Sequence, residues 1–150
     1  MKNTLLTGLF FLALIICSCG KPDKGIPITT SSSEARDLFI QGRDDYENIE
    51  FSAAAKLFDE AIAKDSTFAL AYLYRAYSGG GAQVVRTNLE KAQAMTGKVS
   101  EGERVLIGYM QATSDANRPK QKENLDKLLT MYPEDKRVRL AAGRYFQTVG

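Results

Sequence analysis

ARDLFIQGRDDYENIEFSAAAKLFDEAIAKDSTF, residues 35–68, carries the pattern that decides the fold. Apolar side chains recur at helical spacing over residues 38–46, and the polar stretch 48–50 interrupts them. A second apolar stripe follows over residues 51–64. We therefore predict two helices joined by a short turn within this stretch, and a unit of this size calls for a search for repeats.

The segment resembles a tetratricopeptide repeat (TPR). This motif prefers a large residue at position 4, small residues at 8 and 20, aromatic residues at 17 and 24, and alanine at 27. With Ala35 at position 1, these places are filled, although Gln41, Asp45 and Ser66 depart from the motif. The resemblance implies that small residues let the two helices cross closely while aromatics fill the gap to the next pair. The residues expected to pack the repeats are Leu38, Gly42, Phe51, Ala54, Phe58, Ala61 and, in the last unit, Gly143.

Weaker units keep the same phase toward the C-terminus, beginning at Ala69, Gly102 and Lys136. The pairs Ser31/Glu34 and Ser100/Glu103 read as capping boxes, which mark helix starts, and residues 79–81 (three glycines) end one helix early. We predict an all-α fold, a right-handed α-solenoid of antiparallel helix pairs with about three and a half TPR-like repeats over residues 34–150. The alternative is an unrelated helical bundle.

The first 19 residues look like a leader rather than part of the fold. A lysine precedes an apolar run of about twelve residues, which is shorter than the roughly 20 that a membrane span needs. Ile16-Cys17-Ser18-Cys19 resembles the lipobox of bacterial lipoproteins, with Cys17 the poorer match. The resemblance implies a signal peptide over residues 1–18 and a lipid, such as palmitate, on Cys19.

Residues 19–33 are expected to form the lipidated cysteine and a flexible tether. Two prolines, two glycines and five hydroxyl residues between Gly20 and Ser33 disfavour regular structure. Such a tether would reach about 45 Å when fully extended. The protein is therefore expected to be exported and lipid-anchored to a membrane of a bacterial envelope, with the outer membrane favoured, facing the periplasm or the exterior.

Composition argues against several classes of function. The chain has 150 residues, a net charge of +2 and no histidine. A charge this even does not suggest a nucleic-acid binder, and without histidine the commonest general base and metal ligand are missing. The triple glycine is not followed by the lysine of a phosphate-binding loop, and the acidic clusters read as solvated helix faces. We predict no catalytic residue, no metal site and no cofactor, and therefore no enzyme.

The resemblance implies a concave groove lined by the first helix of each unit, and we expect a peptide or a protein surface to bind there. The expected groove residues are Arg36, Phe39, Arg43, Tyr46, Leu73, Tyr77, Met110 and Arg144. Aromatic and arginine side chains dominate interface hot spots, so Arg43, Tyr46, Tyr77 and Arg144 are the strongest candidates. Two other functions stay open: a glycan-binding or nutrient-uptake accessory lipoprotein, and the input region of a longer sensor or enzyme.

The last predicted helix, residues 134–147, has two interpretations. It could be the polar cap of a finished array, or the array could continue beyond Gly150. Leu140 and Phe146 fall outside the inward-facing stripe, which favours the incomplete array. We expect these two side chains to contribute to an exposed apolar patch, and the chain to self-associate or fray at this end.

Overall fold

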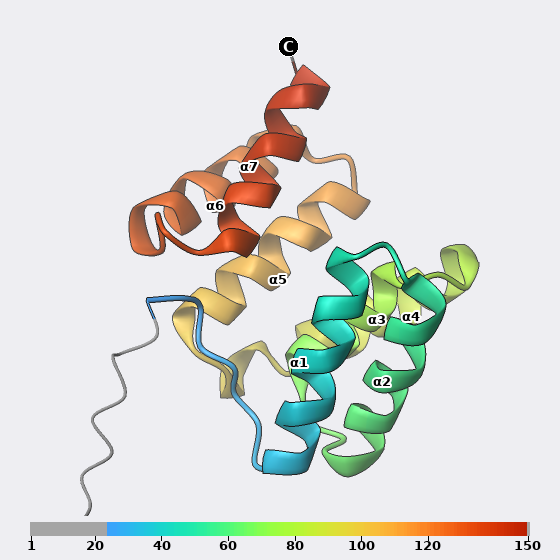
Figure 1. Ribbon diagram of the computed structural model, residues 1–150. Coiled ribbons are helices and arrows are strands. Elements are labelled where there is room, and N and C mark those ends of the chain that lie inside the picture. Colours follow the sequence, from blue (N-terminus) through green and yellow to red (C-terminus); the bar gives the residue numbers. More distant parts are fainter. Residues whose placement is uncertain (1–23, 150) are drawn as a thin grey trace, which may run out of the picture.

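The computed structural model describes residues 24–149 of the chain. Consecutive helices pack as antiparallel pairs, α1 on α2, α3 on α4 and α5 on α6, and α7 packs on α6 (Figure 1). This confirms the predicted all-α array of helix pairs, and the part of the chain that the structure describes contains no strand. The bounds are α1 Ser33–Glu47, α2 Phe51–Lys64, α3 Ala69–Tyr77, α4 Gly81–Ala94, the 3-10 helix η1 Thr96–Lys98, α5 Glu101–Ser114, α6 Arg118–Met131 and α7 Lys136–Val149.

The helix starts follow the sequence with one correction. The capping box predicted at the start of α5 is present: the Glu103 N–H donates to Ser100 Oγ at 3.2 Å, and the Ser100 N–H donates to Glu103 Oε2 at 2.9 Å. The box predicted at Ser31 is wrong by one residue. Ser32 caps α1 by accepting the Ala35 N–H, because Ser31 instead donates its N–H and hydroxyl to Asp65.

The triple glycine ends α3 early, as predicted. Gly79, Gly80 and Gly81 all have positive φ, a backbone conformation that other residues rarely adopt. A Cβ on Gly80 would also lie only 2.8 Å from the Val84 side chain, at the start of α4. The tight turn from α3 into α4 therefore depends on glycine.

An aromatic cluster joins the first helix pair to the second. Phe39, Phe58 and Phe68 are fully buried, and the Phe39 ring centroid lies 5.0 Å from that of Phe68. Tyr74 of α3 closes the cluster, 5.7 Å from Phe58 and 5.2 Å from Phe39. Phe58 is thus buried at the junction of the first two units, as the motif predicts.

Two of the predicted packing residues are placed differently. Ala54 and Ala61 are fully buried as expected and the half-buried Leu38 packs against the core, but Phe51 is exposed. Phe51 opens α2 beside the turn, where its ring packs edge-on against Tyr46 instead of filling the core. Gly143 is also exposed, with open space where its Cβ would be, so no close crossing requires it.

Gly42 and Gly143 give a matched pair of substitutions in helix interiors. A Cβ on Gly42 would lie 2.9 Å from Phe58 Cε1 and 3.0 Å from Leu57 Cβ, so we expect Gly42→Ala to lower the free energy of unfolding by about 1–3 kcal/mol. Gly143→Ala adds a methyl group in open space and should raise it by about 0.5–1 kcal/mol through helix propensity. Urea unfolding measures both, and equal shifts for the two variants would contradict the packing described for Gly42.

Residues 24–32, which we call the strap, run in extended form along one edge of the array into α1 (Figure 1). Ile26 is fully buried, and its N–H donates to Asp135 Oδ2 at 2.6 Å. The expected flexible tether is therefore wrong for this stretch, because its backbone N–H groups find carboxylate partners on the helical domain. The predicted signal peptide and Cys19 lie outside the described residues, and no helix within the described range is long and apolar enough to cross a membrane.

Candidate functional site

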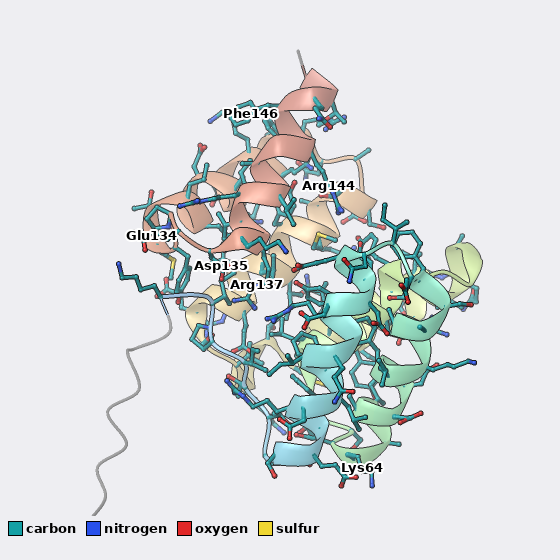
Figure 2. All side chains as sticks on the ribbon, in the orientation of Figure 1. Lys64, Glu134, Asp135, Arg137, Arg144 and Phe146 are labelled. Carbon is teal, nitrogen blue, oxygen red and sulfur yellow. The ribbon has the colours of Figure 1, made fainter. Side chains whose placement is uncertain are left out.

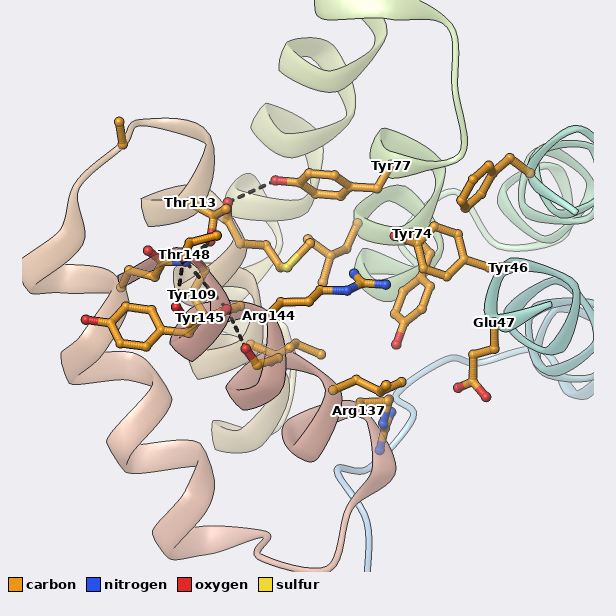
Figure 3. Close-up of a pocket in the computed structure, with 18 of the residues that line it drawn as sticks. Tyr46, Glu47, Tyr74, Tyr77, Tyr109, Thr113, Arg137, Arg144, Tyr145 and Thr148 are labelled. Carbon is orange, nitrogen blue, oxygen red and sulfur yellow. Dashed lines mark hydrogen bonds between the residues drawn. The ribbon is translucent and has the colours of Figure 1, made fainter. Parts of the chain in front are cut away.

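The helices α1, α3, α5 and α7, the first members of successive pairs, share the lining of one groove (Figure 3). Its volume is about 550 Å³. Aromatic residues from all four helices contribute to its lining: Tyr46, Tyr74, Tyr77, Tyr109 and Tyr145. Because alternate helices form this face, the groove is a direct consequence of the paired-helix fold.

Hydrogen bonds fix the tyrosines of the groove floor. The Tyr77 hydroxyl donates to the Met110 carbonyl at 2.9 Å and so ties α3 to α5. The Tyr109 hydroxyl donates to the Ala141 carbonyl at 3.1 Å and ties α5 to α7. These bonds make the floor a preformed surface, which reduces the entropy lost when a ligand binds.

Burial moves the pKa of two of these tyrosines further above physiological pH. It raises the pKa of Tyr74 to about 12, although the nearby Arg137 and Arg43 oppose the shift. Burial also raises the pKa of Tyr77 to about 12, with smaller contributions from Tyr46 and Asp115. At physiological pH both phenols therefore remain protonated, which suits them to packing and hydrogen bonding rather than to proton abstraction.

Exposed apolar side chains concentrate at the rim of the groove. The described residues include five large apolar side chains classed as exposed, and three of them, Ile49, Phe51 and Leu140, line the groove. Ile49 is 73% exposed and has φ +68°, a strained value for a β-branched residue. Exposed apolar groups and backbone strain both cluster at functional sites, which makes this rim the candidate binding surface.

The groove lining carries more positive than negative charge. It includes Arg118, Arg137 and Arg144 but only one carboxylate, Glu47. Glu47 is engaged by Lys136, and Arg137 pairs with Asp135 at 2.5 Å. Arg144 forms no ion pair with any described residue, and Figure 3 shows it reaching from α7 into the groove toward the tyrosines of α1 and α3.

The structure brings together five of the eight predicted groove residues: Tyr46, Leu73, Tyr77, Met110 and Arg144. The other three lie elsewhere. Phe39 is fully buried in the aromatic cluster, Arg36 donates to the Ile28 carbonyl of the strap at 2.9 Å, and Arg43 lies beside Asp44 outside the lining. The first unit is at the end of the array, so only the C-terminal end of α1 faces the groove.

Sequence reasoning missed several lining residues. Tyr74, Tyr109 and Tyr145 are not among the expected groove residues, yet all three line the groove. The motif predicts that Phe51 packs between helices, and nothing in its motif position predicts exposure. The expected exposure of Leu140 and Phe146 is confirmed, at 43% and 57%, but Leu140 alone of the two lines the groove.

The described residues contain no group of three or more side chains that could hold a metal ion.

No protein-family model matches the chain, and no curated protein matches it. Among solved structures, it is similar to the Arabidopsis OM64 TPR domain, with 17% sequence identity and a TM-score of 0.46. This similarity covers 74% of the chain and 93% of the OM64 domain.

Proposed function

We propose that this protein is an interaction module whose groove binds a segment of a partner protein. The observation that carries the proposal is the convergence of Ile49, Phe51 and Leu140 on one preformed, tyrosine-lined groove. Apolar side chains of a partner would displace water from this surface, which is the main source of binding free energy at such sites.

Charge complementarity defines the partner segment further. Arg144 reaches into an apolar groove without an ionic partner among the described residues, and Arg118 bonds only neutral groups, Gln121 and Thr148. A guanidinium in such surroundings favours a carboxylate, with which it forms charge-assisted hydrogen bonds. The proposed ligand is therefore a short segment in which apolar side chains flank an acidic one.

A glycan is less well supported as the ligand. Sugar rings stack on the open faces of aromatic side chains, whereas the groove tyrosines are half-buried or buried and Phe51 is the one exposed aromatic residue in the lining. The groove offers apolar walls and cations instead of such a platform.

A displayed library of random peptides, panned against the purified chain, tests the proposal without a known partner. We expect enriched peptides to combine apolar and acidic residues. Their affinity should fall at least about tenfold for Leu140→Asp and for Arg144→Glu, the scale of a hot-spot loss. Gln147→Asp, on the same helix but outside the groove lining, is the control. Enriched peptides that bind all three variants equally would overturn the assignment of the groove.

We also propose that the module is held at a bacterial envelope membrane through a lipid on Cys19. The apolar leader and the small Ser18 before Cys19 support this. Residues 20–23 lie between Cys19 and the strap, and a stretch of this length can span at most about 17 Å.

Replacing Cys19 with serine tests the anchor. The variant should move from the membrane fraction to the soluble fraction when cells are fractionated. Unchanged membrane retention with Cys17 intact would contradict lipidation at Cys19.

A further inference from the structure

Three carboxylates mark the starts of α3, α5 and α7 along one edge of the array. Asp65 lies in the turn before α3, Glu103 in the first turn of α5, and Asp135 in the turn before α7. All three side chains belong to buried residues, with at most 7% of the residue surface exposed. A buried carboxylate needs hydrogen-bond donors, and the strap supplies them.

The strap follows these carboxylates in reverse order of the array. Ile26 donates its N–H to Asp135, Thr29 to Glu103 Oε1 at 2.8 Å, and Ser31 to Asp65 Oδ2 at 3.0 Å. The Thr29 and Thr30 hydroxyls reinforce the last two contacts, at 2.5 and 2.6 Å. One extended segment of the chain thus ties the first helix of every later unit to the start of α1.

Arg137 connects the strap directly to the groove. Its guanidinium donates to the Ile26 carbonyl at 2.5 Å and to Asp135, and its side chain also lines the groove. Figure 2 shows Glu134, Asp135 and Arg137 gathered at the start of α7, next to the strap. The groove wall formed by α7 is therefore held at its N-terminal end by residues that precede α1.

Other contacts also hold α7, whose main helix partner is α6, a helix that lies away from α1. The neutral bond from the Tyr109 hydroxyl to the Ala141 carbonyl joins α7 to α5, and an exposed pair between Lys136 and Glu47 joins it to the end of α1. Exposed ion pairs contribute little to stability. The charge-assisted bonds to the strap, of which the one from the Ile26 N–H to Asp135 is buried, are stronger than such a pair or a neutral bond, and they fix the orientation of the groups that they join.

We infer that the strap sets the width of the groove by holding α7 at a fixed distance from α1 and α3. Ile26, Thr29, Asp65, Glu103 and Asp135 are positioning residues for the groove, although none of these five lines it. The inference concerns the geometry of the groove alone, so its failure would leave the proposed partner class untouched.

A distance measurement across the groove tests this inference. Spin labels are placed at Asn48→Cys, after α1, and at Gln147→Cys, on α7, in the full chain with Cys17 and Cys19 replaced by serine. Both labelled positions are exposed. Pulsed electron–electron double resonance then gives the distribution of distances between the two spin labels, and so between the α1 and α7 sides of the groove.

Ile26→Asp should expel the strap, because it places a charge in a fully buried position beside Asp135. We expect the distance distribution to become about twofold broader and to move to longer distances, as a released wall samples more positions. Pro27→Asp is the matched control: Pro27 is the next residue, is exposed and has no N–H to lose, so its distribution should equal that of the parent.

Thr29→Pro is a second test variant, which keeps the inference testable if Ile26→Asp does not fold. It removes both the N–H and the hydroxyl that bond Glu103 but leaves Ile26 in place, and we expect partial broadening with unchanged helix content by circular dichroism. A parent-like distribution in a folded Ile26→Asp or Thr29→Pro variant would overturn the inference. So would equal broadening in Pro27→Asp.

Discussion

Phe58→Ala is expected to lower the free energy of unfolding by about 3–5 kcal/mol, the usual range for removing a buried phenylalanine ring. Phe58 is fully buried and contacts the rings of Phe39 and Tyr74, so its loss opens a cavity where the first two helix pairs meet. A domain of this size has about 5–15 kcal/mol of stability in total, so much of it would be lost. Urea unfolding followed by circular dichroism measures the change.

Phe51→Ala is the matched control. The same ring is removed from the same helix, but Phe51 is 40% exposed and packs mainly against Tyr46. We expect a loss of about 0.5–1.5 kcal/mol, close to the value of an aromatic pair at a surface. If Phe58→Ala cost less than about 1 kcal/mol, the assignment of Phe58 to the junction between units would be wrong.

Asp135→Ala should destabilise the fold by about 3–5 kcal/mol, because it removes one partner of a buried ion pair. The side chains of Arg137 and Asp135 are only 9% and 4% exposed, and Asp135 also accepts the Ile26 N–H. Glu134→Ala is the control, since Glu134 pairs with Lys24 in solvent, and it should change stability by less than about 1 kcal/mol. Similar losses for both variants would contradict the role given to Asp135.

The same substitution should change the response to acid. Burial would raise the pKa of Asp135, but hydrogen bonds from Arg137 and from the Ile26 N–H hold it below its usual range. Such a carboxyl stabilises the fold above its unfolded pKa of about 3.9, and this stability is lost as pH falls through the folded pKa. Between pH 6 and pH 3 the parent should therefore lose more stability than Asp135→Ala does.

Much of the fold could be predicted because its determinants are local. The apolar spacing of residues 51–64 gave the bounds of α2, and the Ser100/Glu103 box fixed the start of α5. The all-α array follows from such signals repeated along the chain. Small residues at helix crossings were less reliable: Gly42 packs against Phe58, whereas Gly143 faces open space.

The strap could not be predicted because its contacts are long-range. The Ile26 N–H meets Asp135, which is 109 residues away, and composition alone marks this part of the chain as a linker. Two similar turns indicate where two of the carboxylates lie: Asp65 accepts the N–H of Thr67, and Asp135 accepts the N–H of Arg137. These turns locate the carboxylates, but the sequence does not show what their second oxygens bind.

The groove could be predicted in outline, but some of its lining residues could not, because they too depend on long-range contacts. Motif positions indicate which helix faces the groove, and they placed Tyr46, Tyr77 and Arg144 in it. They do not show that Tyr109 lines the groove or that Arg43 lies outside it beside Asp44, because these placements depend on how helices far apart in sequence pack together.

Nuclear magnetic resonance mapping of a selected peptide tests the central claim most directly, because it shows where on the fold the peptide binds. In a methyl-labelled sample, we expect the largest shifts at Leu73, Leu106, Met110 and Leu140, which line the groove. The methyl groups of Leu57, Leu89 and Leu125, on α2, α4 and α6 and outside the groove lining, should shift little. Shifts concentrated on α2, α4 and α6, with the groove methyl groups unchanged, would contradict the claim that the groove is the binding site.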